Sequence, residues 1–322
     1  MKSTGDSAAI DVGVICGPTA GGKSAIAMWL ADRQPITIVS ADSRQVYRGF
    51  DVGTAKPTTD ERARVPHEGV DVVEPTVRYS SAAWAASAGA WIAGSLSSRR
   101  TPFVVGGTGL YLRALFEGLF EEPPIDAERR RRLERQLGAL GTPELRRWVE
   151  RLDPARSGLG RAQLLRAAEI ALLTGRRISD LHADQRTVAK SHWRPHYLVV
   201  DPGPALAQRI GARLDAMLNA GWLNEVERLM DSVPPDAPAW KATGYEAVRR
   251  MARGELTSAE ARESILVETR QYAKRQRTWF RHQLPPDRVL TVNPLARNWE
   301  ELVERWTTGI VYRGQDASRG RR

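Results

Sequence analysis

Cysteine, lysine and long hydrophobic runs are scarce in this sequence of 322 residues. Cys16 is the single cysteine, so the chain forms no internal disulfide and has too few thiols for a zinc ribbon or finger. No run of about 18 apolar residues is present, which excludes a transmembrane helix, and residues 1–8 are polar, unlike a secretory signal. We therefore expect a cytoplasmic protein that does not contact a membrane.

Acidic residues are also in the minority. The chain has 48 Lys and Arg against 38 Asp and Glu, a net charge of +10, and most of the excess lies in its second half. A lopsided basic balance favours a polyanion such as RNA or DNA as partner, although a basic surface that only sets solubility is the alternative. Because arginine supplies nearly all of this charge, each of the few lysines is a candidate for a role that requires an ammonium group.

Short apolar segments alternate with helical patterns along much of the chain. The apolar segments are residues 12–16, 36–39, 103–105 and 197–200. The helical patterns include residues 24–31, 80–96 and 206–219. This alternation predicts an α/β fold in which a parallel sheet carries helices on both faces. In such sheets ligands bind at the carboxyl ends of the strands.

The pattern changes at residue 121. Two prolines are followed by an arginine-rich stretch around residues 129–132, and no strand signal returns until about residue 197. We interpret residues 120–195 as an all-helical insertion into a core made of residues 9–119 and 196–312. Residues 313–322 are polar and basic, and we expect them to form a disordered tail.

One motif predicts a phosphate site directly. The residues that fit G-x-x-x-x-G-K-[ST], between a strand and a helix, are Gly17, Pro18, Thr19, Ala20, Gly21, Gly22, Lys23 and Ser24. In such a P-loop the backbone N–H groups and the helix N-terminus surround a phosphate. Lys23 would reach the outer oxygens and the Ser24 hydroxyl would hold Mg²⁺, so we expect a diphosphate or triphosphate ligand with Mg²⁺ as cofactor.

Two polar residues follow other strands. Asp42 follows the apolar segment 36–39 and is a candidate magnesium ligand or general base, or alternatively the N-cap of a following helix. Thr108 lies in the glycine-rich loop after residues 103–105, where its hydroxyl could donate to a leaving oxygen or simply stabilise a turn. This loop contains no acidic residue, and the absence of a Walker-B carboxylate disfavours an ATPase or kinase.

A long helical pattern covers residues 260–281. Its basic residues Arg270, Lys274, Arg277 and Arg281 fall within about 60° of one face. Tyr272 and Trp279 lie on the opposite side of the helix. We expect the aromatic side to pack and the basic side to face an anion, although a solvated charged face is the alternative.

With these motifs the chain resembles the tRNA dimethylallyltransferases, also called tRNA isopentenyltransferases. The blocks that carry the resemblance, in chain order, are residues 17–24 (GPTAGGKS), 40–47 (SADSRQVY), 53–57 (GTAKP), 105–111 (VGGTGLY), 241–245 (KATGY) and 269–276 (TRQYAKRQ). The P-loop is shared with many families, whereas the blocks at 40–47 and 269–276 are much more specific.

The resemblance implies transfer of a dimethylallyl group from dimethylallyl diphosphate to N6 of the adenine just 3′ of the anticodon, in tRNAs that read codons beginning with U. It implies that Arg270 and Lys274 help to bind the diphosphate, that Asp42 is the general base, and that Thr108 contacts the bridging oxygen. The insertion would close on the anticodon stem-loop, and we expect a monomer. The expected tRNA contacts are Asp42, Ser43, Arg44, Gln45, Thr108, Arg130, Gln163 and Arg166.

The chain also departs from the family pattern in the insertion. The Asn-Asp pair of the family is absent from residues 157–169, and Gln163 stands where an arginine is common, although Arg166 and Glu169 are in place. Three other functions remain: the same chemistry on AMP or ATP, a P-loop nucleoside kinase, and a non-catalytic RNA-binding module. The arginine-rich insertion favours RNA over AMP, the missing Walker-B acid disfavours the kinase, and the three motifs at one sheet edge disfavour a binding module.

Overall fold

The structure, a computed structural model, describes residues 9–118, 125–185 and 192–319. It contains two compact units, which are described separately. The first unit consists of the chain up to Phe116 together with the chain from Ser191 onward, and the second consists of residues 117–190. In the described parts, no helix is both long and apolar enough to span a membrane.

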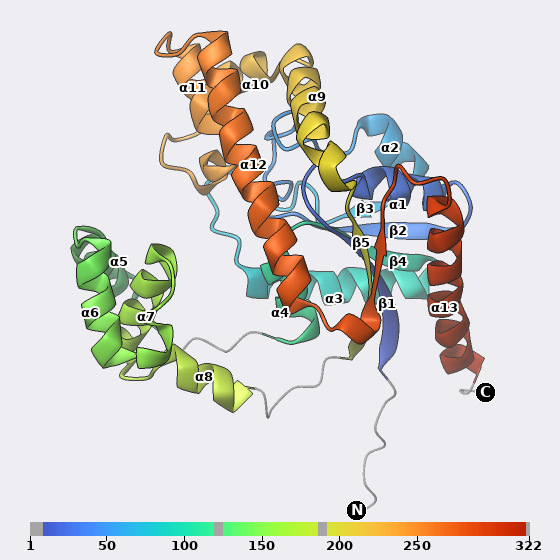
Figure 1. Ribbon diagram of the computed structural model, residues 1–322, viewed down its shortest axis with the longest axis horizontal. Helices are drawn as coiled ribbons and strands as arrows, with labels where there is room; N and C mark the ends of the chain where they lie inside the picture. Colours follow the sequence, from blue (N-terminus) through green and yellow to red (C-terminus); the bar gives the residue numbers. More distant parts are fainter. Residues whose placement is uncertain (1–8, 119–124, 186–191, 320–322) are drawn as a thin grey trace, which may run out of the picture. The chain divides into compact units, whose positions relative to one another are not determined.

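A six-stranded sheet forms the centre of the first unit (Figure 1). Neighbouring strands are parallel and stand in the order β3-β2-β4-β1-β5-β6. This arrangement confirms the predicted α/β fold with a parallel sheet. The strands are β1 (Ile10–Cys16), β2 (Ile36–Ala41), β3 (His67–Glu68), β4 (Thr101–Gly106), β5 (Trp193–Val200) and β6 (Val289–Val292).

The register of the sheet brings three loops together. Cys16 of β1 and Ala41 of β2 both pair with Gly106 of β4, so these three strands end level with one another. The loops that follow them therefore meet at one edge of the sheet. They contain the P-loop, Asp42 and Thr108, respectively.

Helices cover both faces of the sheet. Successive residues of a strand point to opposite faces, and in β1 Val14 belongs to one buried cluster while Ile15 belongs to the other. Helices α3 and α4 pack on the Val14 side, where Trp84 of α3 is fully buried, and α1 and α13 pack on the Ile15 side. These helices are α1 (Lys23–Ala31), α3 (Ser81–Ser97), α4 (Gly109–Phe116) and α13 (Trp299–Arg319).

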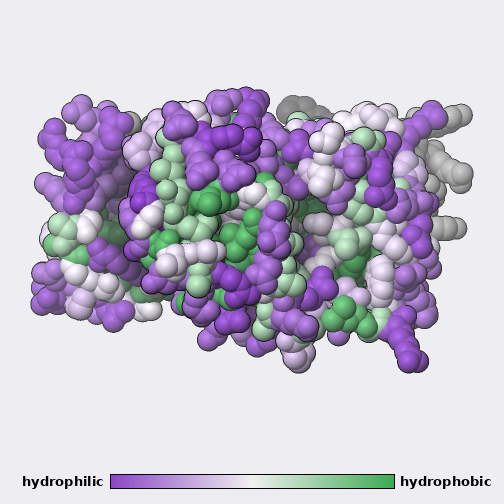
Figure 2. Space-filling view, turned by 90° about the horizontal axis from the view of Figure 1, so that it is seen from above, coloured by the Kyte–Doolittle hydropathy of each residue, from purple (hydrophilic) through white to green (hydrophobic). Residues whose placement is uncertain are grey.

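After β5 the chain forms a group of helices, α9–α12 (Figure 1). The longest, α12, begins with a capping box between Thr257 and Glu260 and contacts α9, α11 and α4. Seen from the end at which these helices lie, hydrophobic residues gather near the middle of the surface and hydrophilic residues border them (Figure 2). The remaining helices of this unit are α2 (Thr59–Arg64), α9 (Leu206–Asn219), α10 (Trp222–Ser232), α11 (Tyr245–Ala252) and α12 (Ser258–Gln283).

The second unit is helical and has a core of its own. Leu145, Val149, Leu164 and Ile170 are fully buried there. The buried carboxylate of Asp153 accepts hydrogen bonds from the backbone N–H and the hydroxyl of Ser179, in the first turn of α8. The helices are α5 (Ala127–Gly138), α6 (Thr142–Leu152), α7 (Arg161–Thr174) and α8 (Ile178–Gln185).

The structure differs from the predicted elements in three respects. The predicted insertion ends at residue 195, but β5 already begins at Trp193. The start was missed because Pro195 is unusual within a strand. The proline is tolerated here because β6 pairs with β5 only from Tyr197 onward. The short strands β3 and β6 were missed because two to four residues carry no periodic signal. The predicted disordered tail is helical to Arg319, since extending an existing helix costs far less than starting one; residues 320–322 lie outside the described residues.

Candidate active site

The backbone of the P-loop contacts the ammonium group of Lys23. Gly17 has φ of +141°, and a Cβ at this position would lie 2.3 Å from the backbone oxygen of Val200, so only glycine fits beside the end of β5. The Lys23 ammonium donates to the backbone oxygens of Gly17 and Pro18, at 3.1 and 2.8 Å. The loop is therefore already closed around the place where a phosphate group would sit.

Two cations and one carboxylate set the charge at this loop. Burial, together with the nearby charge of Arg213, lowers the pKa of Lys23 to about 8, whereas Asp42 opposes the shift. Burial also lowers the pKa of Arg213, again against the effect of Asp42. Because one carboxylate cannot balance two desolvated cations, the site favours an added anion.

Arg213 was not predicted from the sequence. It lies on α9 and lines two of the cavities that open beside the P-loop. No local motif marks it, because the charged groups near it, Lys23 and Asp42, are far away in the chain. The one signal was its position in the helix that follows β5, within reach of the carboxyl edge of the sheet.

A cavity of about 300 Å³ opens beside the P-loop. Its polar end includes Thr19 and Ala20 of the P-loop, Asp42 and Arg213. Five apolar side chains also line the cavity and are called the apolar wall below: Ile210, Leu214, Met217, Trp222 and Ile265. The rest of the lining includes polar and charged residues such as Lys241, Glu268 and Arg275. The cavity can therefore hold a ligand with an anionic head and a short hydrocarbon group.

Asp42 lies at the polar end of this cavity, immediately after β2. Its Oδ1 accepts the backbone N–H of Arg44 at 2.8 Å. Residues 43–46 form a turn, so the alternative that Asp42 caps a helix is wrong. The hydrogen bond to Arg44 fixes the carboxylate through one oxygen, and the carboxylate keeps further lone pairs for a ligand.

Thr108 lies beside the same turn. Its Oγ1 accepts the backbone N–H of Ser43 at 3.1 Å, and its own backbone N–H donates to the oxygen of Ala41. The hydroxyl of Tyr272 is hydrogen-bonded to Thr108, and burial raises the pKa of this tyrosine to about 12. The P-loop, Asp42 and Thr108 thus meet at one sheet edge, as their strand ends required; their catalytic roles stay predictions.

Gln276 of α12 joins two of these loops, a role that was not predicted from the sequence. Its Oε1 accepts the backbone N–H of Thr19 at 2.8 Å, and its Nε2 donates to the oxygen of Gly107 at 3.0 Å. A Cβ at Gly107 would lie 2.2 Å from that Nε2, and a Cβ at Gly109 would lie 2.3 Å from the ring of Trp279. These glycines therefore let α12 approach the loop that carries Thr108.

The basic face of α12 does not form the wall of the cavity. Arg270 and Lys274 are exposed, and the residues of α12 that reach the cavity include Tyr272 and Arg275. The reason is geometric, since Arg270 and Lys274 each lie two residues, or about 200°, from Tyr272 around the helix. Arg277, on the same predicted stripe, is paired with Asp201, with 2.8 Å between Nε and Oδ2. The predicted diphosphate contacts from Arg270 and Lys274 therefore do not follow from this geometry, and Arg213 occupies the expected place.

Gln45, a predicted tRNA contact, makes its side-chain contacts within the protein. Its Oε1 accepts the hydroxyl of Ser40 at 3.0 Å. Its Nε2 donates to the backbone oxygens of Thr54 and Ala55, at 3.3 and 3.0 Å. Both N–H donors of the amide are thereby used, so Gln45 holds the loop that follows Asp42 rather than presenting these donors to a ligand.

Glycines of two other motif blocks surround one side chain. A Cβ at Gly53 would lie 2.1 Å from Nε1 of Trp222, and a Cβ at Gly244 would lie 2.5 Å from its Cη2. The indole is 1 % exposed and lines the cavity. The blocks at residues 53–57 and 241–245 therefore need glycine where they close on this ring.

Three predicted tRNA contacts lie in the second unit. Arg130 and Arg166 both pair with the carboxylate of Glu169, the second at 3.1 Å, and this side chain is only 8 % exposed. Gln163 accepts the backbone N–H of Gly160 at the start of α7. These contacts explain the structural placement of the three residues, and their contacts with RNA stay predictions.

Known proteins are similar to this chain over most of its length. The family model described as IPP transferase matches residues 45–283, and that described as Isopentenyl transferase matches residues 10–66. The tRNA dimethylallyltransferase of Nitrobacter hamburgensis is 42 % identical over 287 residues, covering 87 % of this chain and 90 % of that protein. That of Deinococcus radiodurans is 40 % identical over 278 residues, covering 84 % and 90 %.

Solved structures give the same result. The tRNA isopentenylpyrophosphate transferase of Bacillus halodurans has a TM-score of 0.66 at 29 % identity, covering 96 % of this chain and 98 % of that one. A eukaryotic dimethylallyltransferase described as acting on tRNA has a TM-score of 0.71 at 25 % identity, covering 92 % and 77 %. Both the sequence and the fold are thus shared along nearly the whole chain. The chain belongs to the IPP transferase family.

Proposed function

We propose that this protein transfers the dimethylallyl group of dimethylallyl diphosphate to N6 of the adenine just 3′ of the anticodon, in tRNAs that read codons beginning with U, and releases diphosphate. The observation that carries the proposal is the cavity, in which a P-loop with two desolvated cations adjoins Asp42 and an apolar wall. The tRNA dimethylallyltransferases among its relatives support the choice of donor and acceptor.

The cavity suits the donor at both ends. The diphosphate would lie against the P-loop N–H groups, Lys23 and Arg213, and would restore the charge balance that two cations and Asp42 leave incomplete. The dimethylallyl group would lie against the apolar wall, which begins with Ile210 and Leu214 on the same helix as Arg213. This arrangement holds C1 near Asp42.

Magnesium fits this site through the substrate. In the described parts of the chain, no group of three or more His, Cys, Asp and Glu side chains could hold a metal ion. Mg²⁺ does not need such a group, because it keeps several waters and binds through one or two protein oxygens plus phosphate oxygens. Ser24, at the start of α1, would supply the hydroxyl ligand. When bound, the ion neutralises charge on the diphosphate.

The acceptor requires a base, because the lone pair of the exocyclic amine is delocalised into the adenine ring. As the bond from N6 to C1 forms, the bond from C1 to the bridging oxygen breaks and its electron pair leaves with the diphosphate. Asp42 takes the proton from N6. The hydroxyl oxygen of Thr108 accepts the N–H of Ser43, and its O–H donates a hydrogen bond to the bridging oxygen as negative charge develops there.

The RNA must deliver its base to this edge of the sheet. An adenine in a loop can leave its stack more easily than one in a duplex. We propose that Ser43 and Arg44, in the turn after Asp42, contact this base, and that the basic residues of the second unit contact the anticodon stem-loop. Arg44 lines the cavity, which supports its assignment.

The test is an acceptor comparison. Purified protein is incubated with Mg²⁺, dimethylallyl diphosphate and either unmodified tRNA or AMP, and released nucleosides are analysed by mass spectrometry. The proposal predicts dimethylallyl addition to adenosine in tRNA alone. Addition to AMP would favour an adenylate isopentenyltransferase, and ATP turnover without prenyl transfer would favour a kinase.

A further inference from the structure

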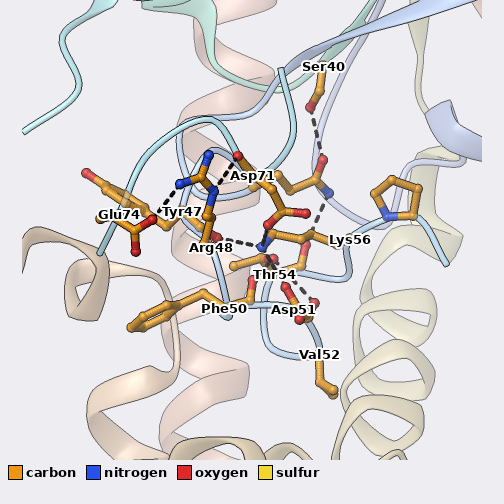
Figure 3. Close-up of polar contacts among 12 residues, drawn as sticks. Ser40, Tyr47, Arg48, Phe50, Asp51, Val52, Thr54, Lys56, Asp71 and Glu74 are labelled. Carbon is orange, nitrogen blue, oxygen red and sulfur yellow. Dashed lines mark hydrogen bonds and ion pairs between the residues drawn. The ribbon is translucent and has the colours of Figure 1, made fainter. Parts of the chain in front are cut away.

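Lys56 of the first unit is a buried cation with three oxygen partners. Its side chain is 2 % exposed, and its ammonium donates to the backbone oxygen of Tyr47 at 2.5 Å, to Oδ1 of Asp51 at 2.6 Å and to Oδ1 of Asp71 at 2.5 Å (Figure 3). An ammonium group has three N–H donors, and here each finds one oxygen. In a chain whose positive charge comes almost entirely from arginine, this is a position that requires a lysine.

These contacts hold a loop whose two ends reach the reaction site. The loop runs from Asp42 to Lys56, and both its first residues and Gly53 and Thr54 line the cavity beside the P-loop. Gln45 joins the two ends, because its Nε2 donates to the backbone oxygens of Thr54 and Ala55. A shift at Lys56 is therefore passed to the turn that fixes Asp42.

The loop is held on its other side as well. Glu225 of α10 is 3 % exposed, and its Oε2 accepts the backbone N–H groups of Asp51 and Val52, at 2.9 and 2.6 Å. Its Oε1 accepts the hydroxyl of Tyr245 at 2.7 Å. The buried carboxylate of Glu225 and the buried ammonium of Lys56 therefore both bind the segment around Asp51.

These contacts stabilise a backbone conformation that is otherwise unfavourable. Ala55, next to Lys56, has φ of +46°, and Asp71, one of its acceptors, has φ of +55°. Such left-handed conformations are unfavourable for residues with a Cβ and persist where the surroundings over-determine them. The paired ammonium supplies that constraint at both positions.

We propose that Lys56 is a positioning residue for prenyl transfer, which acts through the loop from Asp42 to Lys56 and requires an ammonium group rather than a positive charge alone. Arginine cannot replace it, because a planar guanidinium does not direct three donors at oxygens that converge on one nitrogen. The inference rests on the proposed function, since it assigns the effect of Lys56 to the step in which Asp42 receives the N6 proton.

The test separates donor binding from transfer. Lys56→Arg and Lys56→Met are compared with wild type for the affinity of a non-hydrolysable donor analogue and for the single-turnover rate with tRNA. Because the P-loop and Arg213 lie outside the loop, we expect donor affinity to stay within about threefold, and the rate to fall by about 10- to 100-fold in both variants. A structural role alone would lower the active fraction, seen as the stoichiometry of analogue binding, and leave the rate per active site unchanged.

Two further variants keep the test decisive. Asp51→Ala removes one acceptor of the ammonium from a side chain that is 57 % exposed, so the fold should survive, and we expect a smaller fall in rate. Arg62→Gln removes the other cation paired with the Asp71 carboxylate, at an exposed position, and is the matched control with an expected rate close to wild type. A wild-type rate in Lys56→Arg overturns the inference. If the Lys56 variants do not fold, a wild-type rate in Asp51→Ala overturns it. Failure of the wild type itself to prenylate tRNA would instead overturn the proposed function.

Discussion

Gln276 offers a quantitative test of how the site is assembled. It bridges the P-loop and the Thr108 loop through two hydrogen bonds, and it is 6 % exposed. Gln276→Met keeps an unbranched side chain but leaves the Thr19 N–H and the Gly107 oxygen without this partner. A buried polar group that loses its partner costs about 1–3 kcal/mol. We therefore expect the free energy of unfolding to fall by about 2–4 kcal/mol.

The same substitution should slow the reaction, because the P-loop and Thr108 would no longer be held relative to one another. We expect kcat/KM to fall by about 10- to 100-fold. Gln276→Glu should recover stability as pH falls, since the protonated carboxyl can again donate to Gly107, which raises its pKa in the folded state above the unfolded value.

The assay is equilibrium urea unfolding together with steady-state prenyl transfer. Thr278→Ala, on the exposed side of α12, is the control, and its stability should lie within about 0.5 kcal/mol of wild type. A Gln276→Met protein with wild-type stability and wild-type kcat/KM would refute the reasoning.

Three further predictions concern charge. Arg213→Gln should weaken donor binding by about 10- to 100-fold, measured by calorimetry with a donor analogue, because a charged hydrogen-bond donor to phosphate is lost; unchanged donor affinity would contradict the assignment. Because the pKa of Lys23 is lowered to about 8, its charge is present below that pH and lost above it, so the dissociation constant of the analogue should rise as pH passes 8 in wild type but not in Lys23→Arg; parallel profiles would contradict this. Glu169→Gln should lower the free energy of unfolding of the helical unit by about 2 kcal/mol in thermal or urea unfolding, since Arg130 and Arg166 lose their shared carboxylate; an unchanged transition would show that the pairs contribute nothing.

The parts of the site that could be predicted from sequence are those placed by strand ends. A P-loop after β1, Asp42 after β2 and Thr108 after β4 must meet, because parallel strands in register bring their carboxyl ends to one edge. The fold class follows from the same alternation of short apolar strands and helices. These inferences need only local spacing and the general geometry of parallel sheets.

The remaining parts depend on how distant segments pack. Arg213 and Gln276 come from helices that follow β5, and no local pattern says which turn of α9 or α12 faces the P-loop. The basic residues Arg270 and Lys274 of α12 are exposed because the burial of Ala273 and Gln276 fixes which way the helix faces, and no local pattern gives that direction. Gln45 was expected to face RNA, and only the three-dimensional loop reveals that both its donors are used.

The central claim is that Asp42 receives the proton of N6 while the P-loop side of the cavity holds the donor. The direct measurement is the single-turnover rate of dimethylallyl transfer to tRNA by Asp42→Asn, with donor-analogue affinity measured on the same preparation. Asparagine can still accept the N–H of Arg44, so the turn is kept. The account predicts a rate about 100- to 10,000-fold below wild type with donor affinity unchanged or higher. A wild-type transfer rate in this variant would contradict the account.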